Sequence, residues 1–190
     1  LLKTPAGTKK AAALYLADLP PPYDDDGGDL LPSLFTALSH HSATDPTLAP
    51  LATTLLKKTF PKAGASPPLP LYAATMTAHA QTGAIQKVRA MYSHAVRTYG
   101  PSLDIAHAVL ISYHRAVPPV TNRDCYALRA RAFLRDEMVG DGDGGAAATV
   151  ESYRLVMQAW GETTSGRALE EMTALMEEMT ALMEEMTALM

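Results

Sequence analysis

The sequence predicts an all-α protein in which short helices follow one another in antiparallel pairs. Three observations support this prediction. Alanine, the strongest helix former, accounts for 32 of 190 residues, whereas aromatic residues make up only 6% of the chain. Proline and glycine interrupt the apolar segments at short intervals. Related segments also recur at a spacing of 34 or 35 residues, which is typical of a helical-hairpin repeat array, or α-solenoid.

Three helices are expected in the first part of the chain, and proline marks their ends. The run of three prolines at 20–22 ends the first, because proline cannot continue a helix. Pro32 and Pro50 lie in the first turns of the next two, where proline is tolerated. The expected ranges are 9–19, 30–41 and 47–60, with the acidic linker YDDDGGD between the first two.

Six further helices are expected in the rest of the chain. The segment 84–97 places apolar residues at intervals of three and four, the spacing of one helix face. Thr121 and Asp124 form an expected capping box. Breaks are expected near Gly83, Pro101, Pro118 and the GDGDGG loop. The expected ranges are 72–81, 84–97, 105–115, 122–139, 151–160 and 167–190.

Three segments of the second half align with one another. LYAATMTAHAQTG from Leu71 corresponds to IAHAVLISYHRAV from Ile105, and SYRLVMQAWGETTSG around Tyr153 is a third copy. The longer gap before the third copy fits an inserted GDGDGG loop. Each copy has two corresponding positions seven residues apart, most of which hold an aromatic residue or histidine. They are Tyr72 and His79, then Ala106 and Tyr113 or else His107 and His114, then Tyr153 and Trp160.

These copies resemble the pentatricopeptide repeat family, whose unit is a pair of antiparallel helices. The family often has glycine in its hairpin, as at Gly83, and closes its second helix with an acidic residue before Met, as in FLRDEM and ALEEM. The resemblance covers about residues 70–176. It divides the chain into degenerate helical hairpins with an acidic linker at 1–69, repeats at 70–169 and a Met-rich helix at 170–190. Tetratricopeptide and other helical hairpins are the alternative.

The terminal segment repeats EEMTALM three times without change. Its apolar residues form a heptad stripe, which predicts an amphipathic helix or a short coiled coil. The stripe consists of Met172, Leu175, Met179, Leu182, Met186 and Leu189. An unvaried repeat also arises from sequence duplication or from a placeholder sequence, so we assign no function to it.

No motif in the sequence predicts catalysis or metal binding. A nucleophile elbow, a phosphate-binding loop and an HExxH motif are all absent. Two acidic stretches could begin a calcium-binding EF-hand loop, at Asp24 and at Asp141. Neither fits, because the twelfth position, which requires Glu, holds Phe35 in the first and Ser152 in the second. His40 and His41 have no His or Cys four residues further on and are expected on the surface, and Cys125 is expected in the core. We therefore expect no enzyme, no cofactor and no metal.

The net charge of −4 conceals a strong segregation of charge. Residues 57–135 carry +9, and the remainder carries −13. A basic segment of this kind favours a polyanionic partner such as RNA. The alternative is a solvated basic face that is balanced by the acidic ends folding back on it. No apolar run is long enough to span a bilayer, and no signal peptide is recognised.

Base recognition in the resembling family depends chiefly on the residue after the first aromatic and on the last residue of the repeat. The first of these positions holds Ala73, then His107 or Ala108, then Arg154. Alanine has no side-chain donor or acceptor, and His and Arg are not the family's usual readers. We therefore expect contacts to RNA phosphates without base recognition. The candidate residues are Lys87, Arg89, Arg97, Arg115, Arg123, Arg129, Arg131 and Arg135.

The resemblance thus implies a non-catalytic organellar protein that is built into a ribonucleoprotein. A mitochondrial ribosome is the leading expectation, with contacts to rRNA phosphates and to neighbouring proteins, and the chloroplast is the alternative location. Two other functions remain open: a protein scaffold in another large organellar complex without RNA, and a fragment of a free RNA-processing factor. One continuous basic face would favour RNA, whereas scattered basic residues would favour the scaffold.

Overall fold

A computed structural model describes residues 2–17, 30–61, 66–116, 123–139 and 147–188. All regular structure in these ranges is helical, so the prediction of an all-α protein is confirmed for them. The elements are α1 (Pro5–Ala17), α2 (Leu30–His41), α3 (Leu48–Thr59), α4 (Leu69–Gln81), α5 (Ile85–Tyr99), α6 (Leu103–Arg115), α7 (Arg123–Phe133), the π-helix η1 (Leu134–Val139), α8 (Val150–Gly161) and α9 (Ala168–Ala188).

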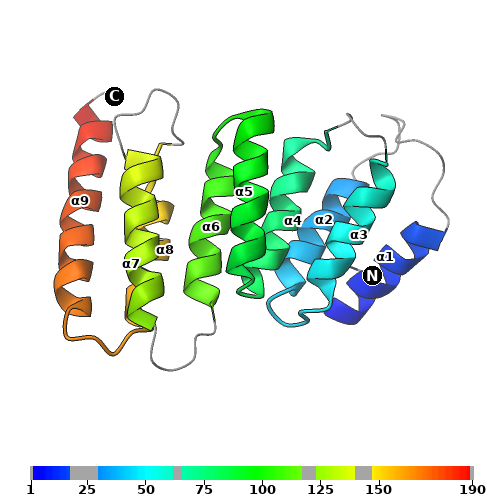
Figure 1. The fold of residues 1–190 in the computed structure, drawn as a ribbon, viewed down its shortest axis with the longest axis horizontal. Helices are drawn as coiled ribbons and strands as arrows, with labels where there is room; N and C mark the ends of the chain where they lie inside the picture. The colour runs from blue at the N-terminus through cyan, green and yellow to red at the C-terminus, as the bar shows by residue number, and fades with distance from the viewer. Residues whose placement is uncertain (1, 18–29, 62–65, 117–122, 140–146, 189–190) are drawn as a thin grey trace.

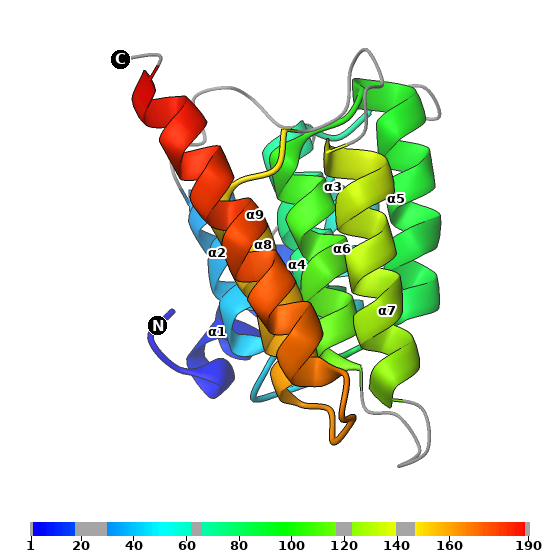
Figure 2. The same cartoon turned by 90° about the vertical axis from the view of Figure 1, so that its left-hand side faces the viewer.

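The helices stack in antiparallel pairs along the long axis of the molecule (Figure 1). Three-residue turns join α4 to α5 and α5 to α6, so these consecutive helices run in opposite directions. The helices α2, α4, α6 and α8 each contact the next and form one layer, which we call the inner layer. On one side of it lie α3, α5 and α7, the outer layer, each packed against the two inner helices that flank it (Figure 2). This packing is compatible with a helical repeat array.

The core lies between the two layers, and the neighbouring helices α4 and α5 differ in how many residues they bury. The inner helix α4 contacts helices on several sides and buries eight of its 13 residues. The outer helix α5 buries only Val88 and Ala95 of its 15 residues, because only one of its faces contacts the inner layer. The opposite face of α5 lies in solvent, which is where charged residues are expected.

Proline places the beginnings of two helices earlier than the sequence analysis predicted. α1 begins at Pro5 instead of residue 9, and α4 begins at Leu69 with Pro70 in its first turn instead of at Tyr72. The fixed φ of proline suits the first helical turn, where its missing N–H has no partner to lose. The predicted end of the first helix, the capping box at Thr121 and the breaks at Pro118 and GDGDGG lie outside the described residues.

Two local features were not predicted. The backbone N–H of Thr149 donates to Ser152 Oγ at 3.1 Å, and Ser152 N donates to Thr149 Oγ1 at 3.4 Å, so a reciprocal capping box begins α8. The helix expected over 122–139 also changes character, because α7 continues as the π-helix η1. In this segment Leu134 and Met138 are buried, while Arg135 is exposed.

The terminal helix α9 packs on α8 through the predicted heptad stripe. Leu175 is fully buried, and Met179 and Leu182 are partly buried against the core. Met186 is 58% exposed, so the stripe emerges from the packed region toward its carboxyl end. No described helix combines the length and the apolar character that crossing a membrane requires.

Candidate nucleic-acid interface

Most of the candidate cations lie on helices of the outer layer. Lys87, Arg89 and Arg97 belong to α5, and the arginines from 123 to 135 belong to α7 and η1. Both helices pack on α6 from the same side (Figure 2), and Arg115 ends α6 itself. The side chain of Arg123 lies outside the described part of the structure. The side chains that are exposed to solvent are those of Lys87, Arg89, Arg97, Arg115, Arg129 and Arg135.

Five of these exposed cations form no ion pair with a carboxylate of the described residues. They are Lys87, Arg89, Arg97, Arg115 and Arg129. The contacts recorded for two of them are weak or local. Arg97 Nε donates to the Ser93 carbonyl of its own helix at 3.0 Å, and the Arg129 guanidinium lies 5.9 Å from the ring centroid of Tyr126. Their charge is therefore available to an external anion.

Arg131, by contrast, is engaged with the terminal helix. Its guanidinium forms a bidentate pair with Glu178 of α9, with Nη1 donating to Oε2 at 2.7 Å, and its Nε lies 3.9 Å from Glu171 Oε2. The hydrogen bond to Glu178 raises the pKa of Arg131 above its usual value. An acidic end of the chain thus folds back on this part of the basic segment. Arg131 is occupied while α9 is in place.

Arg135 lies one turn further along the same chain segment and differs from Arg131 in exposure. Its Nε donates to the carboxylate of the adjacent Asp136 at 2.8 Å, and both side chains are mostly in solvent. Exposed pairs of this kind exchange readily with water and ions. Arg135 therefore remains accessible to a phosphate, although it already has a carboxylate neighbour.

The positions that would read bases are buried or already hydrogen-bonded. Ala73 is 5% exposed, and Ala108 is fully buried. His107 Nε2 lies 2.9 Å from Ser152 Oγ in the cap of α8, and burial lowers the pKa of His107. Arg154 is exposed, and its Nε donates to Glu151 of the same helix at 2.6 Å. In this structure, none of the four side chains is an unpartnered polar group at the surface.

The aligned residues His79, Tyr113 and Trp160 lie in the packed interior, each at most 3% exposed. His79 Nε2 is 2.7 Å from Thr53 Oγ1 of α3. Burial, assisted by the positive charge of Lys87, lowers the pKa of His79 to about 4, so the ring is neutral at pH 7. The column therefore contributes to packing between neighbouring helices. Among the described residues, no group of three His, Cys, Asp or Glu is arranged for a metal.

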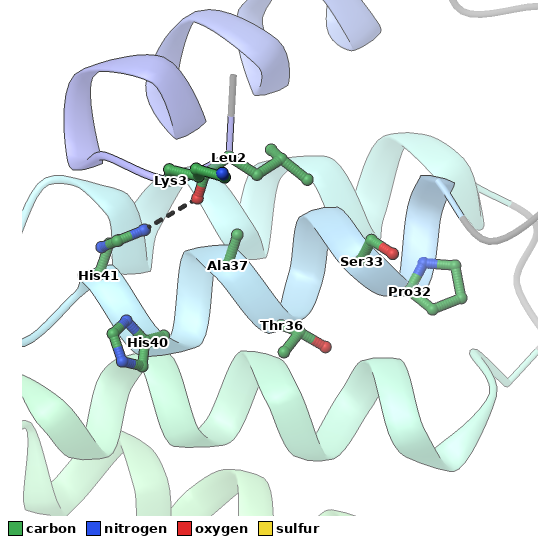
Figure 3. Close-up of a pocket in the computed structure, with 8 residues that line it drawn as sticks. All are labelled: Leu2, Lys3, Pro32, Ser33, Thr36, Ala37, His40 and His41. Carbon is green, nitrogen blue, oxygen red and sulfur yellow. Dashed lines mark hydrogen bonds between the residues drawn. The ribbon is translucent and has the colours of Figure 1, made fainter.

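Cys125, His40 and His41 complete the residues singled out in the sequence. Cys125 is half-buried in α7, so its expected place in the core is wrong. His40 is exposed as expected, whereas His41 is half-buried and its Nε2 donates to the Leu2 carbonyl at 3.0 Å. The two histidines line a pocket between the N-terminal segment and α2 (Figure 3). The other polar side chains of its lining are Lys3, Ser33 and Thr36.

Two residues that the sequence analysis did not select lie beside Lys87. Lys87 Nζ donates to Thr53 Oγ1 of α3 at 3.4 Å, and Lys57 is close enough to affect its titration. Burial and the charge of Lys57 together lower the pKa of Lys87. The four-residue spacing of Thr53 and Lys57 places them on one face of α3. They lie near Lys87 because of how α3 and α5 pack, and the residue pattern within a single helix does not predict such packing.

Comparison with protein-family models, with characterised proteins and with solved structures finds no match to this chain. The resemblance to pentatricopeptide repeats therefore rests on the residue pattern described above.

Proposed function

We propose that this protein is a non-catalytic pentatricopeptide-like repeat protein that binds structured RNA through its phosphates. The observation that supports the proposal most directly is the set of exposed cations on α5, α7 and the end of α6 that have no carboxylate partner among the described residues. Unneutralised cations on neighbouring elements attract a polyanion and release its counterions on binding. The base-reading positions are buried or already hydrogen-bonded, so we expect this contact to be independent of sequence.

The architecture that we propose is an α-solenoid whose repeats are the pairs α2–α3, α4–α5, α6–α7 and α8–α9. Two observations support it. The first helix of each pair packs on the first helix of the next, and each second helix from α3 to α7 packs on both flanking inner helices. The three aligned segments of the sequence also begin α4, α6 and α8. Each repeat of such an array gains most of its buried surface from its neighbours.

The same proposal assigns the protein to an organellar ribonucleoprotein, with the mitochondrial ribosome as the assembly that fits best. A solenoid offers one long side to RNA backbone and another to neighbouring proteins. Contacts that rest on phosphate alone suit a partner whose position is fixed by assembly, because they carry no sequence information of their own.

Charge variants of the outer layer test the RNA contact. We expect replacement of Arg89, Arg97 and Arg129 by Gln to weaken binding of two unrelated RNAs to the same extent. The slope of log affinity against log salt should also fall by about 2 to 3, because each lost phosphate contact removes about 0.7 to 1 from it. The matched control replaces the exposed lysines at 3, 9 and 10 by Gln, which removes the same charge near α1. Equal effects of the two triple variants, or a strong preference for one RNA that survives in the outer-layer variant, would contradict the proposal.

A protein scaffold is the second candidate. The repeated sequence of α9 predicted no function by itself, but the exposure of its side chains in the structure favours this candidate. Leu169, Met176 and Met183 recur every seven residues along this helix and are 75%, 55% and 50% exposed. An apolar row of this kind is typical of a protein contact. If the scaffold function holds, Met176→Glu with Met183→Glu should release the protein from its native assembly, whereas ribonuclease should not. Release by ribonuclease alone would favour the RNA function.

A further inference from the structure

A polar cluster joins two successive outer helices. Thr53 and Lys57 lie one turn apart on one face of α3, and Lys87 reaches Thr53 from the first turn of α5. Lys87 Nζ donates to Thr53 Oγ1 at 3.4 Å. The cluster combines residues that lie 34 positions apart, so it exists only when the helix pairs are stacked.

The positive charge of this cluster is not balanced within the described structure. Neither Lys57 nor Lys87 forms an ion pair with a described carboxylate. Two ammonium groups held near each other raise the free energy of the folded state unless an anion lies between them. The lowered pKa of Lys87 is the expected consequence of burial and of this repulsion.

His79 lies on the buried side of the cluster and contacts Thr53. Its ring is 3% exposed, and its Nε2 lies 2.7 Å from the hydroxyl oxygen of Thr53. Because the ring is neutral at pH 7, it adds no third full charge and serves as a hydrogen-bond partner of Thr53. The contact restrains the hydroxyl beside Lys87. The cluster thus offers a restrained hydroxyl and two ammonium groups on one side of the protein.

We propose that Lys57, Lys87 and the hydroxyl of Thr53 form a subsite for one phosphate group between α3 and α5. Two ammonium groups act as point charges that suit a compact anion with several oxygens and up to two charges. A planar carboxylate is matched better by the fork of an arginine, which this cluster lacks. That the phosphate belongs to RNA rests on the proposed function, and free phosphate is the other source of the same chemistry.

Titration with inorganic phosphate tests the subsite itself, with the full chain and NMR signals of the lysine Nζ groups and the His79 ring as readouts. We expect a saturable shift of the Lys87 and His79 signals that sodium chloride of equal ionic strength does not reproduce. Lys57→Gln and Lys87→Gln should each weaken phosphate binding at least tenfold, because each removes a charged hydrogen-bond donor. The control is Lys58→Gln, which removes an exposed charge from the same turn of α3.

Thr53→Val and Thr53→Ser separate a binding role from a structural one. Valine keeps the shape of threonine without the hydroxyl and should weaken phosphate, whereas serine should retain most of the affinity. Thermal unfolding of each variant shows that it is folded. Absence of a saturable phosphate shift in the folded wild type, or equal weakening by Lys58→Gln, would overturn the subsite.

RNA-binding measurements on the same variants identify the source of the phosphate. Loss of affinity for two unrelated RNAs in both Lys57→Gln and Lys87→Gln, with competition by inorganic phosphate, supports the subsite as an RNA contact. Saturable phosphate binding with unchanged RNA affinity supports it as a site for free phosphate, and in that case the RNA proposal depends on α5 and α7 alone. RNA binding by a wild type that shows no saturable phosphate shift overturns the subsite and leaves the proposed function standing.

Discussion

Gly83 packs against the end of the next inner helix: a Cβ atom added to it would lie 2.7 Å from the carbonyl oxygen of Arg115. Its φ angle of +70° also lies in the left-handed region that favours glycine. The turn between α4 and α5 therefore touches the backbone that ends α6. Through this contact one helix pair fixes the position of the next.

Replacement of Gly83 by Ala should lower the free energy of unfolding by about 2 to 4 kcal/mol, since left-handed strain adds to overlap with backbone. Gly100 is the control, because its φ is +83° but nothing lies within 4 Å of an added Cβ. Gly100→Ala should cost only about 1 to 2 kcal/mol. Urea denaturation measures both changes, and equal losses would contradict the close approach of Gly83 to α6.

His79 should make the protein less stable in acid. Its pKa is about 4 in the folded protein against 6.5 for the free side chain, so the unfolded chain binds a proton first as the pH falls. The neutral ring contributes its full stability above pH 6.5, and this is lost as the pH falls to 4. We expect wild type to lose about 2 to 3 kcal/mol more than His79→Gln between pH 7 and pH 4.

The comparison of wild type with His79→Gln has an internal control in the other buried histidines. His107 and His114 also have pKa values lowered by burial, and they are present in both, so their contributions cancel. Denaturation curves at several pH values give the difference directly. Parallel pH profiles for wild type and His79→Gln would show that the buried ring is not the group that titrates.

The pair of Arg131 with Glu178 should hold α9 against α7. Arg131→Gln should lower the free energy of unfolding by about 1 to 2 kcal/mol, a value reduced for the exposure of Glu178. Amide hydrogen exchange in α9 should also become faster. Arg135→Gln is the matched variant, and it should change neither quantity measurably because that pair is exposed. Unchanged exchange in α9 for Arg131→Gln would argue against the docking role.

Two leucines of α9 test how this helix packs: Leu175 belongs to the heptad stripe, and Leu169 lies outside it. Leu175 is fully buried, whereas Leu169 is 75% exposed. Leu175→Ala should cost about 2 to 4 kcal/mol through lost burial and the cavity left behind. Leu169→Ala should change stability by less than about 0.5 kcal/mol. Thermal or urea denaturation measures both, and similar losses would mean that α9 packs on α8 by a different face.

Much of the fold could be predicted because proline and glycine act locally. The range of α2 agrees with its prediction at both ends, and Pro32 accounts for its start because proline is suited to a first turn. The start of α1 was placed too late because Pro5 precedes a lysine pair that has no apolar periodicity. The π-helix after Phe133 was not predictable, because its residues are as compatible with continued α-helix as with a π turn.

The basic residues of the candidate site could be predicted from the sequence, but their contacts in the folded protein could not. The sequence identified the basic residues of α5 and α7, yet the partners of Arg131 and Lys87 lie 47 and 34 positions away. Such contacts depend on how helix pairs stack, and the periodicity within a helix carries no information about them. The buried state of Ala73 and Ala108 is likewise a result of packing between inner helices.

Ultraviolet cross-linking of the native protein to its bound nucleic acid, followed by mass spectrometry of the linked peptides, shows whether the outer layer contacts RNA. We expect RNA attached to peptides of the outer layer, around Arg89 and Arg97 of α5 and Arg129 of α7. RNA attached instead around Ala73, His107 and Arg154 of the inner layer, or the absence of RNA from the native protein, would contradict this expectation.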